Sequence, residues 1–265
     1  MPWLNLLVIL LYVAAAAAIS ARLFHHQGPQ HKWSTIVGSL ALLAHLYLLN
    51  QSIFASTEQN MSITNVASLI AWIISISMTL ASFSLSSALL LPMVYGFSAL
   101  VVLINWLLPS THIMHLQLQP GLISHISIAL IAYGCLMIAL LYALQLSYIN
   151  YRLKHKQASM LHSSLPPLMN VEAVLIKLLL VGTLLLSLSL LSGFVFLENM
   201  FAEGQAHKTI LSCIAWGIYV ATLIGHYRFG WRGKVIIISS CVGAFVLTLG
   251  YFGSRFVKEV ILGHI

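Results

Sequence analysis

The feature that most constrains the fold of this chain is a series of eight long apolar runs. A helix needs about 20 apolar residues to cross the roughly 30 Å hydrocarbon core of a bilayer. The runs are Trp3–Leu23, Ser34–Phe54, Asn65–Phe83, Ser87–Leu108, Gly121–Ile149, Leu175–Leu197, Thr209–Tyr227 and Val235–Gly253. Because a helix satisfies its own backbone hydrogen bonds in lipid, we predict an all-α bundle with about eight transmembrane spans.

The composition leaves too little polar surface for a soluble domain. Hydrophobic residues make up 60% of the chain and charged residues only 6%, whereas roughly a quarter of a soluble domain is charged. We therefore expect residues 1–265 to form a single transmembrane domain. The three cysteines lie in separate apolar runs, and this pattern indicates neither a disulfide framework nor a zinc site.

The placement of the basic residues predicts how the spans are oriented. The net charge is +7, but the Lys and Arg residues lie in short loops between spans, which argues against nucleic acid as a partner. Three basic loops lie on the same side if eight spans cross the membrane, and they contain Arg22 and Lys32; Arg152, Lys154 and Lys156; and Arg228, Arg232 and Lys234. The positive-inside rule then predicts that these loops are cytoplasmic and that the N-terminus lies outside.

Histidine is the most informative residue type, with 12 His against 5 acidic residues. His45, His125 and His226 lie within predicted spans, where an ionisable side chain is costly and is by default a functional hypothesis. Small residues share their helical faces, such as Ala129 and Ala132 with His125, so all three are expected to face other helices. The alternative for each is a histidine that only hydrogen-bonds between helices.

Imidazole is a good ligand for haem iron, and two imidazoles give six-coordinate haem. With a rise of about 1.5 Å per residue, His125 lies roughly 6 Å and His45 roughly 13 Å below the outer surface, so the two could approach each other. His226 is expected near the inner surface. His125 and His45 are therefore the candidate iron ligands, with His226 and His115 as further haem-binding candidates.

Polar residues in the third span add a possible lining for such a site. They follow one helical face and are Asn65, Ser68, Trp72, Ser75 and Thr79. This stripe fits either a cofactor groove or helix packing. The chain shows no Gly-rich phosphate loop, acid pair or nucleophile arrangement, so we do not expect an enzyme.

Several segments resemble the cytochrome c assembly family, which includes the haem-handling CcsA and CcmC membrane proteins. LISHISIALIAYGCLMIALLYALQLSY (Leu122–Tyr148) resembles the span H-[VI]-x6-Y-[AG] of that family, GWRGK (Gly230–Lys234) its inner loop and GYFGSRFV (Gly250–Val257) its last span. The similarity is closer to the YpjD branch of inner membrane proteins, which also resembles HemX. The segments similar to that branch are NVASL (Asn65–Leu69), LLPMVYGFSAL (Leu90–Leu100), LPPLMN (Leu165–Asn170), GHYRFGWRG (Gly225–Gly233) and YFGSR (Tyr251–Arg255).

The resemblance implies a multi-pass protein of the bacterial inner (cytoplasmic) membrane, with the assembly-like region at about residues 65–257. It matches His125 to the family's outer haem-ligating histidine, and His226 and His264 lie near further histidines of the family. The tryptophan-rich motif W-G-x-Y-W-x-W-D is absent, because Phe196–Ile210 contains neither Trp nor Asp. The resemblance therefore implies haem b within the bundle, through His45, His125 or His226, rather than haem presented at the outer surface.

The sequence thus predicts a haem-handling, cytochrome c assembly-like membrane protein. Its expected partners are the lipid bilayer and a membrane protein of haem or cytochrome biogenesis. The alternative is a HemX-like membrane regulator or assembly partner that binds no haem. A transporter with a histidine proton relay is a third interpretation, against which the absence of an internal repeat argues.

Overall fold

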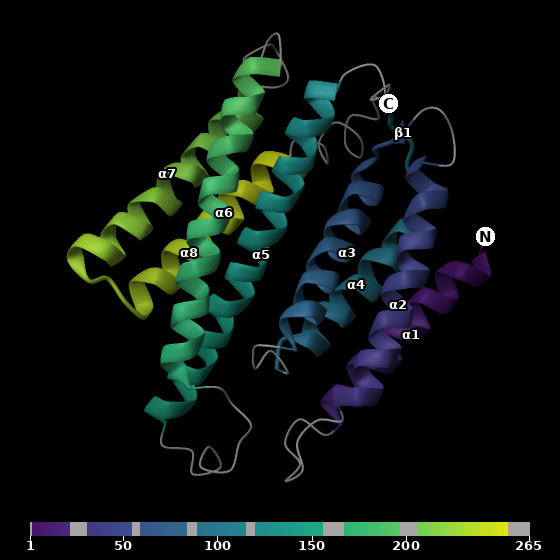
Figure 1. Ribbon diagram of the computed structural model, residues 1–265, viewed down its shortest axis with the longest axis horizontal. Coiled ribbons are helices and arrows are strands. Elements are labelled where there is room, and N and C mark those ends of the chain that lie inside the picture. The colour runs from purple at the N-terminus through teal and green to yellow at the C-terminus, as the bar shows by residue number, and fades with distance from the viewer. Residues whose placement is uncertain are drawn as a thin grey trace. The chain divides into compact units, whose positions relative to one another are not determined.

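The computed structural model describes residues 2–21, 31–54, 59–83, 89–114, 120–155, 167–196 and 206–253, and these are mostly helical (Figure 1). Eight α-helices lie in these ranges: α1 (Pro2–Ser20), α2 (His31–Leu49), α3 (Ile63–Ala81), α4 (Leu91–Leu107), α5 (Pro120–Lys154), α6 (Leu168–Phe196), α7 (Ala206–Phe229) and α8 (Lys234–Thr248). The π-helical turns η1 (Asn50–Phe54) and η4 (Leu249–Gly253) extend α2 and α8, and the short strands are β1 (Gln59–Asn60) and β2 (Ile113–Met114). The all-α prediction is confirmed.

Each predicted apolar run coincides with one helix. Within the described ranges, seven of the helices are long and apolar enough to cross a membrane, and α4 is a shorter apolar helix of 17 residues. At about 1.5 Å per residue, α4 is roughly 25 Å long, at the lower limit for a span. The protein is therefore a polytopic helical membrane protein.

The strands at the start of α3 and after the end of α4 indicate that α4 spans the same distance as α3 in the opposite direction. Strand β1 comes just before α3, and β2 follows α4 along the chain. The two strands pair antiparallel, with Gln59 opposite Met114 and Asn60 opposite Ile113. The end of α4 is thereby tied to the beginning of α3, as expected for two antiparallel spans.

The helices form two compact units, residues 1–114 with 151–166, and residues 115–150 with 167–265. We call them unit 1 and unit 2. In unit 1, α1 packs on α2 and α4, and α3 packs on the same two helices. In unit 2, α7 packs on α6 and α8, and side chains of α5 bond to α6 and α8. That the whole chain forms one domain stays a prediction.

The exterior of both units is apolar, as a lipid-facing surface requires. Large hydrophobic side chains on it are at least half exposed, including Leu43 on α2, Phe97 on α4, Leu191 on α6 and Phe245 on α8. Buried polar residues are concentrated inside unit 1, where they include His45, Asn65, Ser68, Ser75 and Ser98. The units are thus apolar outside and partly polar inside, the inverse of a soluble bundle.

Candidate functional site

His125 lies in the second turn of α5, where it faces the last turns of α6. Its Nδ1 atom is 3.0 Å from the backbone oxygen of Ser189 and 3.0 Å from Oγ of Ser192. Ser192 in turn donates its hydroxyl to the same Ser189 oxygen, at 2.8 Å. A carbonyl oxygen can only accept, so Nδ1 of His125 carries the proton.

This bond fixes both the tautomer and the direction of the ring. With the proton on Nδ1, the lone pair of His125 is on Nε2, which forms no hydrogen bond with any other described residue. Histidines that bind metals usually donate their other ring N–H to a carbonyl or carboxylate in this way. The half-buried His125 ring thus has the hydrogen-bonding pattern of a histidine that could bind a metal through Nε2.

The start of α5 is held closely against the end of α6. A Cβ atom at Gly121 would overlap the ring of Phe196, the last residue of α6. The absence of a side chain at this position lets the two helix ends approach. Together with the hydrogen bond to Ser189, this packing fixes where His125 lies in unit 2.

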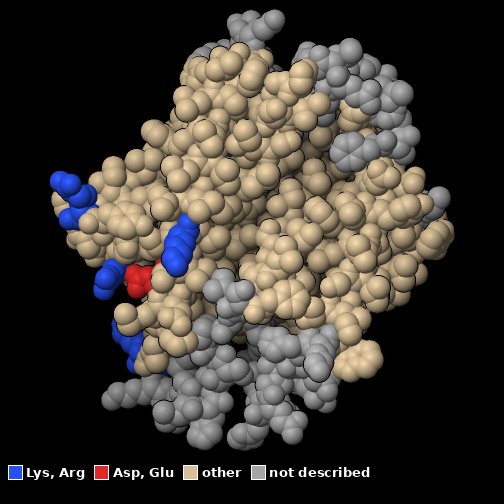
Figure 2. Space-filling model, viewed as in Figure 1, with Lys and Arg blue, Asp and Glu red and all other residues tan. Residues whose placement is uncertain are grey.

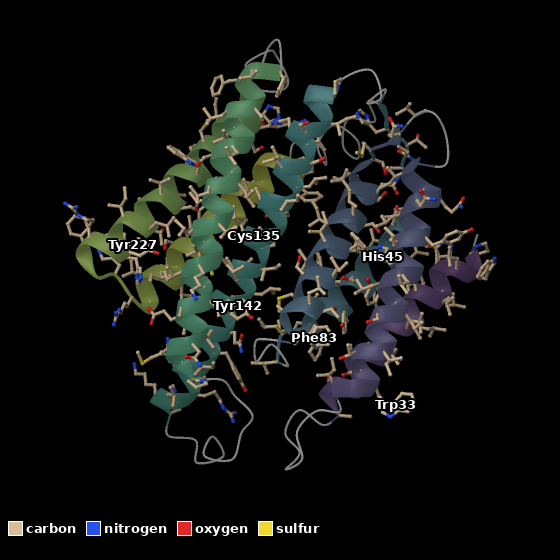
Figure 3. The ribbon with its side chains drawn as sticks, viewed as in Figure 1. Trp33, His45, Phe83, Cys135, Tyr142 and Tyr227 are labelled. Atoms are coloured by element: carbon tan, nitrogen blue, oxygen red, sulfur yellow. The ribbon has the colours of Figure 1, made fainter. Side chains whose placement is uncertain are left out.

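His45 is in a different situation, because both of its ring nitrogens are already bonded. It is fully buried inside unit 1, on α2 (Figure 3). Its Nδ1 is 3.0 Å from the hydroxyl of Tyr12 on α1, and its Nε2 is 2.9 Å from Oγ of Ser68 on α3. An iron atom at either nitrogen would replace one of these two bonds.

A second group of buried hydroxyls lies between α3 and α4 in unit 1. Ser98 is bonded to the backbone oxygen of Ala71 at 3.3 Å and to Ser75 at 2.7 Å. Because the carbonyl only accepts, Ser98 donates to it and accepts from Ser75.

The hydrogen bonds of Tyr12, His45 and Ser68 link α1, α2 and α3, and the bond between Ser75 and Ser98 links α3 and α4. None of these buried side chains has a polar atom without a hydrogen-bonding partner. The cost of burying these groups among apolar helices is offset in this way. These bonds favour a structural role for His45 in unit 1.

The polar residues of the α3 stripe form hydrogen bonds to neighbouring helices. Thr79 bonds to the Tyr95 hydroxyl at 2.8 Å, and Nε1 of Trp72 donates to the backbone oxygen of Leu42 at 2.9 Å. Asn65 accepts from the amide of Asn105 at 3.1 Å. These contacts favour helix packing over a cofactor groove, the two interpretations that the sequence left open.

His226 lies near the end of α7 and holds the turn that follows. Its Nδ1 is 2.9 Å from the backbone oxygen of Trp231, a carbonyl that can only accept, so His226 donates. Its Nε2 has no hydrogen-bonding partner among the described residues. The ring lies beside the short α7–α8 connection rather than deep in unit 2.

The remaining candidates cannot be placed. His115 and His264 lie outside the described residues. His45 belongs to unit 1 and His125 to unit 2, so the expected approach of these two side chains stays a prediction. Within the described ranges no group of three His, Cys, Asp or Glu residues could hold a metal ion, but a haem iron needs only one or two axial ligands.

Two residues with a place in unit 2 were not singled out by the sequence. His207 is exposed in the first turn of α7, the first helix after the segment that replaces the tryptophan-rich motif. Its place directly after that segment is the sequence feature that could have identified His207 as a candidate. Glu172 accepts a hydrogen bond from the backbone N–H of Gly233, at 3.2 Å, and so ties α6 to the start of α8. This partner, 61 residues away, could not be foreseen.

Fold and site together define a multi-pass membrane protein in which Nε2 of His125 and Nε2 of His226 form no hydrogen bond with another described residue. A family model described as cytochrome C assembly protein matches residues 33–262. The chain belongs to the cytochrome c assembly family. The match begins before the region predicted from the sequence and includes most of unit 1.

Individual relatives agree with this assignment. The chain is 36% identical to inner membrane protein YpjD of Escherichia coli strain K12 over 263 residues, which are 98% of this chain and 100% of the relative. It is 30% identical over 141 residues to an uncharacterized 28.8 kDa protein of Azospirillum brasilense, covering 52% of each chain. No solved structure matches the chain. The predicted multi-pass inner-membrane location is confirmed.

Proposed function

We propose that this protein binds haem b through Nε2 of His125, as a haem-handling member of its family and not as an enzyme. The observation that supports the proposal is the hydrogen bond between His125 Nδ1 and the Ser189 carbonyl, at 3.0 Å. That bond leaves the coordinating nitrogen free and fixes its direction. Haem bound here would supply an iron centre that is carried or held, and the residues of the chain would bind and orient it.

The residues around His125 fit such a ligand. Ser189 and Ser192 hold the imidazole from α6, and hydrogen bonds of this kind raise the basicity of the ligand. Apolar residues dominate both helices, in keeping with the apolar faces of a porphyrin. His45 is the weaker candidate, since an iron would have to displace Tyr12 or Ser68.

A second axial ligand would come from another histidine at the same end of unit 2. His207 is the described candidate, because α7 begins where the connection from the end of α6 arrives. His115 and His264 are alternatives on sequence grounds. Loss of this second histidine would weaken haem binding without abolishing it.

A second candidate function is a HemX-like regulator or membrane assembly partner without bound haem. The absence of Trp and Asp from Phe196–Ile210 favours it, because the chain lacks the motif with which other family members hold haem at the outer surface. This function predicts a membrane protein that co-purifies with the chain, and no dependence of that partner on His125.

Absorption spectra of the detergent-purified protein test the proposal. After expression with ample haem, the wild type should show a near-stoichiometric Soret band, and His125→Ala should lose most of it. His155→Ala is the matched control, because His155 is exposed and bonds only within its own helix end. A wild type without a Soret band would reject haem binding and favour the regulator function.

A further inference from the structure

The connection between α7 and α8 is short and tightly fixed. It consists of residues 230–233, in which Gly230 and Gly233 have φ angles of 67° and 57°. Glycine adopts this left-handed region without the steric penalty of other residues. We call residues 225–234, with the side chains they present, the basic turn.

Hydrogen bonds at both ends hold the basic turn in one conformation. The N–H of Trp231 donates to Gly225 O at 3.0 Å, and the N–H of Gly230 donates to His226 O at 3.2 Å. With Gly230 in the left-handed conformation, its bond to His226 O is the αL arrangement that closes a helix C-terminus. The ring of Trp231 lies over Gly225, where any Cβ atom would overlap it.

Two further side chains lock the same segment. His226 donates from Nδ1 to the backbone oxygen of Trp231 at 2.9 Å. The carboxylate of Glu172, on α6, accepts from the N–H of Gly233 at 3.2 Å, directly before α8 begins. The negative charge that complements the α8 N-terminus is therefore supplied from within the protein.

The cations at this end of unit 2 form no ion pair with the described part of the chain. Arg228, Arg232 and Lys234 belong to the basic turn, and Lys177 lies on α6; all four side chains are exposed. None of them forms a hydrogen bond or ion pair with another described residue. Glu172 is the only acidic residue within the described ranges, and Figure 2 shows blue Lys and Arg side chains beside its red carboxylate.

Aromatic side chains indicate the depth of the basic turn in the membrane. Tyr227, Phe229 and Trp231 are 61%, 74% and 39% exposed, and Tyr227 points outward from the end of α7 in Figure 3. Exposed Trp and Tyr side chains at helix ends lie at the level of the lipid headgroups. The three cations of the basic turn are therefore at the depth of the lipid headgroups.

From this combination we infer that the basic turn is a binding site for the phosphodiester headgroup of an anionic phospholipid. Guanidinium groups bind phosphate oxygens through paired N–H donors. The rigid backbone of the turn keeps these groups exposed and limits the conformational freedom lost on binding. The charge bias predicts that the lipid lies in the cytoplasmic leaflet. The inference does not depend on haem binding.

Native mass spectrometry of the delipidated, detergent-solubilised full chain tests the site. Phosphatidylglycerol and phosphatidylcholine with identical acyl chains would be titrated separately. The wild type should bind phosphatidylglycerol more tightly, and Arg232→Gln should weaken it about fivefold, since one cation near lipid contributes on the order of 1 kcal/mol. Arg228→Gln together with Arg232→Gln should weaken it further.

Lys154→Gln is the matched control, because Lys154 is an exposed cation in the last turn of α5, outside the basic turn. It should leave phosphatidylglycerol binding unchanged. Equal binding of the two lipids, or an equal loss with Lys154→Gln, would overturn the inference in favour of general charge attraction. Displacement of phosphatidylglycerol by millimolar inorganic phosphate would assign the site to a soluble phosphate instead and also overturn it.

Discussion

At the scale of single residues, the hydrogen bonds of a histidine distinguish a structural imidazole from one that is available to a metal. His45 uses both ring nitrogens, with Tyr12 and Ser68 as partners. His125 uses one nitrogen and leaves the other free. Both residues were candidate iron ligands in the sequence analysis, because a position within a span can be predicted from the sequence and hydrogen-bond partners cannot.

Removal of His45 should lower stability and leave haem binding intact. His45→Ala leaves Tyr12 and Ser68 with unsatisfied buried hydroxyls and creates a cavity, at a cost of about 2–4 kcal/mol. Thermal unfolding in detergent should show a clearly lower midpoint. The haem content of the protein that remains folded should equal that of the wild type, and loss of haem at unchanged stability would identify His45 as a ligand.

Weakening the support of His125 should weaken haem binding without abolishing it. Ser192→Ala removes one acceptor for Nδ1 and retains the Ser189 carbonyl. Loss of such a supporting group lowers metal affinity by about tenfold or somewhat more. Haem titration of the apoprotein measures the change. Ser124→Ala is the control, because Ser124 bonds only to Pro120 O in the same helix, and an equal loss in both variants would contradict the role of Ser192.

At the scale of helices and turns, the sequence predicts the existence of each element better than its ends. The sixth span was expected from Leu175, whereas α6 begins at Leu168. The charged residues Glu172 and Lys177 interrupt the apolar pattern near the start of this helix, which hides its first residue in the sequence. In the structure the Glu172 carboxylate accepts a hydrogen bond from the N–H of Gly233. The polar stripe on α3 was visible in the sequence, but its partners His45 and Tyr95 come from α2 and α4, and only helix packing brings them there.

The two left-handed glycines should be needed for the α7–α8 turn. Gly230→Ala forces a side chain into the left-handed region, which costs about 1–2 kcal/mol. Gly217→Ala is the matched control on α7, since a Cβ there meets nothing within 4 Å, and it should stabilise the helix by up to about 1 kcal/mol. Thermal unfolding of both variants makes the comparison, and equal stability would show that the turn tolerates another conformation.

At the scale of the whole molecule, the orientation depends on whether the 17-residue helix α4 crosses the membrane. The number of spans before α5 determines the side on which Lys154 lies. The pairing of β1 with β2 supports a full crossing, because it returns the end of α4 to the beginning of α3. The sequence predicted this span from apolar length alone.

Cysteine labelling should place Lys154 on the cytoplasmic side. Lys154→Cys, in a chain whose Cys135, Cys213 and Cys241 are replaced by Ala, should react with an impermeant maleimide only in inside-out vesicles. Thr111→Cys, directly before β2, should react only in right-side-out vesicles. The reverse pattern, with Thr111→Cys reacting only in inside-out vesicles and Lys154→Cys only in right-side-out vesicles, would mean that α4 does not cross the membrane.

The most direct test of haem ligation by His125 is to remove its side chain by mutation and to add free imidazole in its place. His125→Gly should be purified with little haem, and millimolar imidazole with added haem should restore the Soret band. His45→Gly in parallel should retain its haem in the folded fraction and should not respond to imidazole. A Soret band in His125→Gly equal to that of the wild type, without imidazole, would contradict ligation by His125.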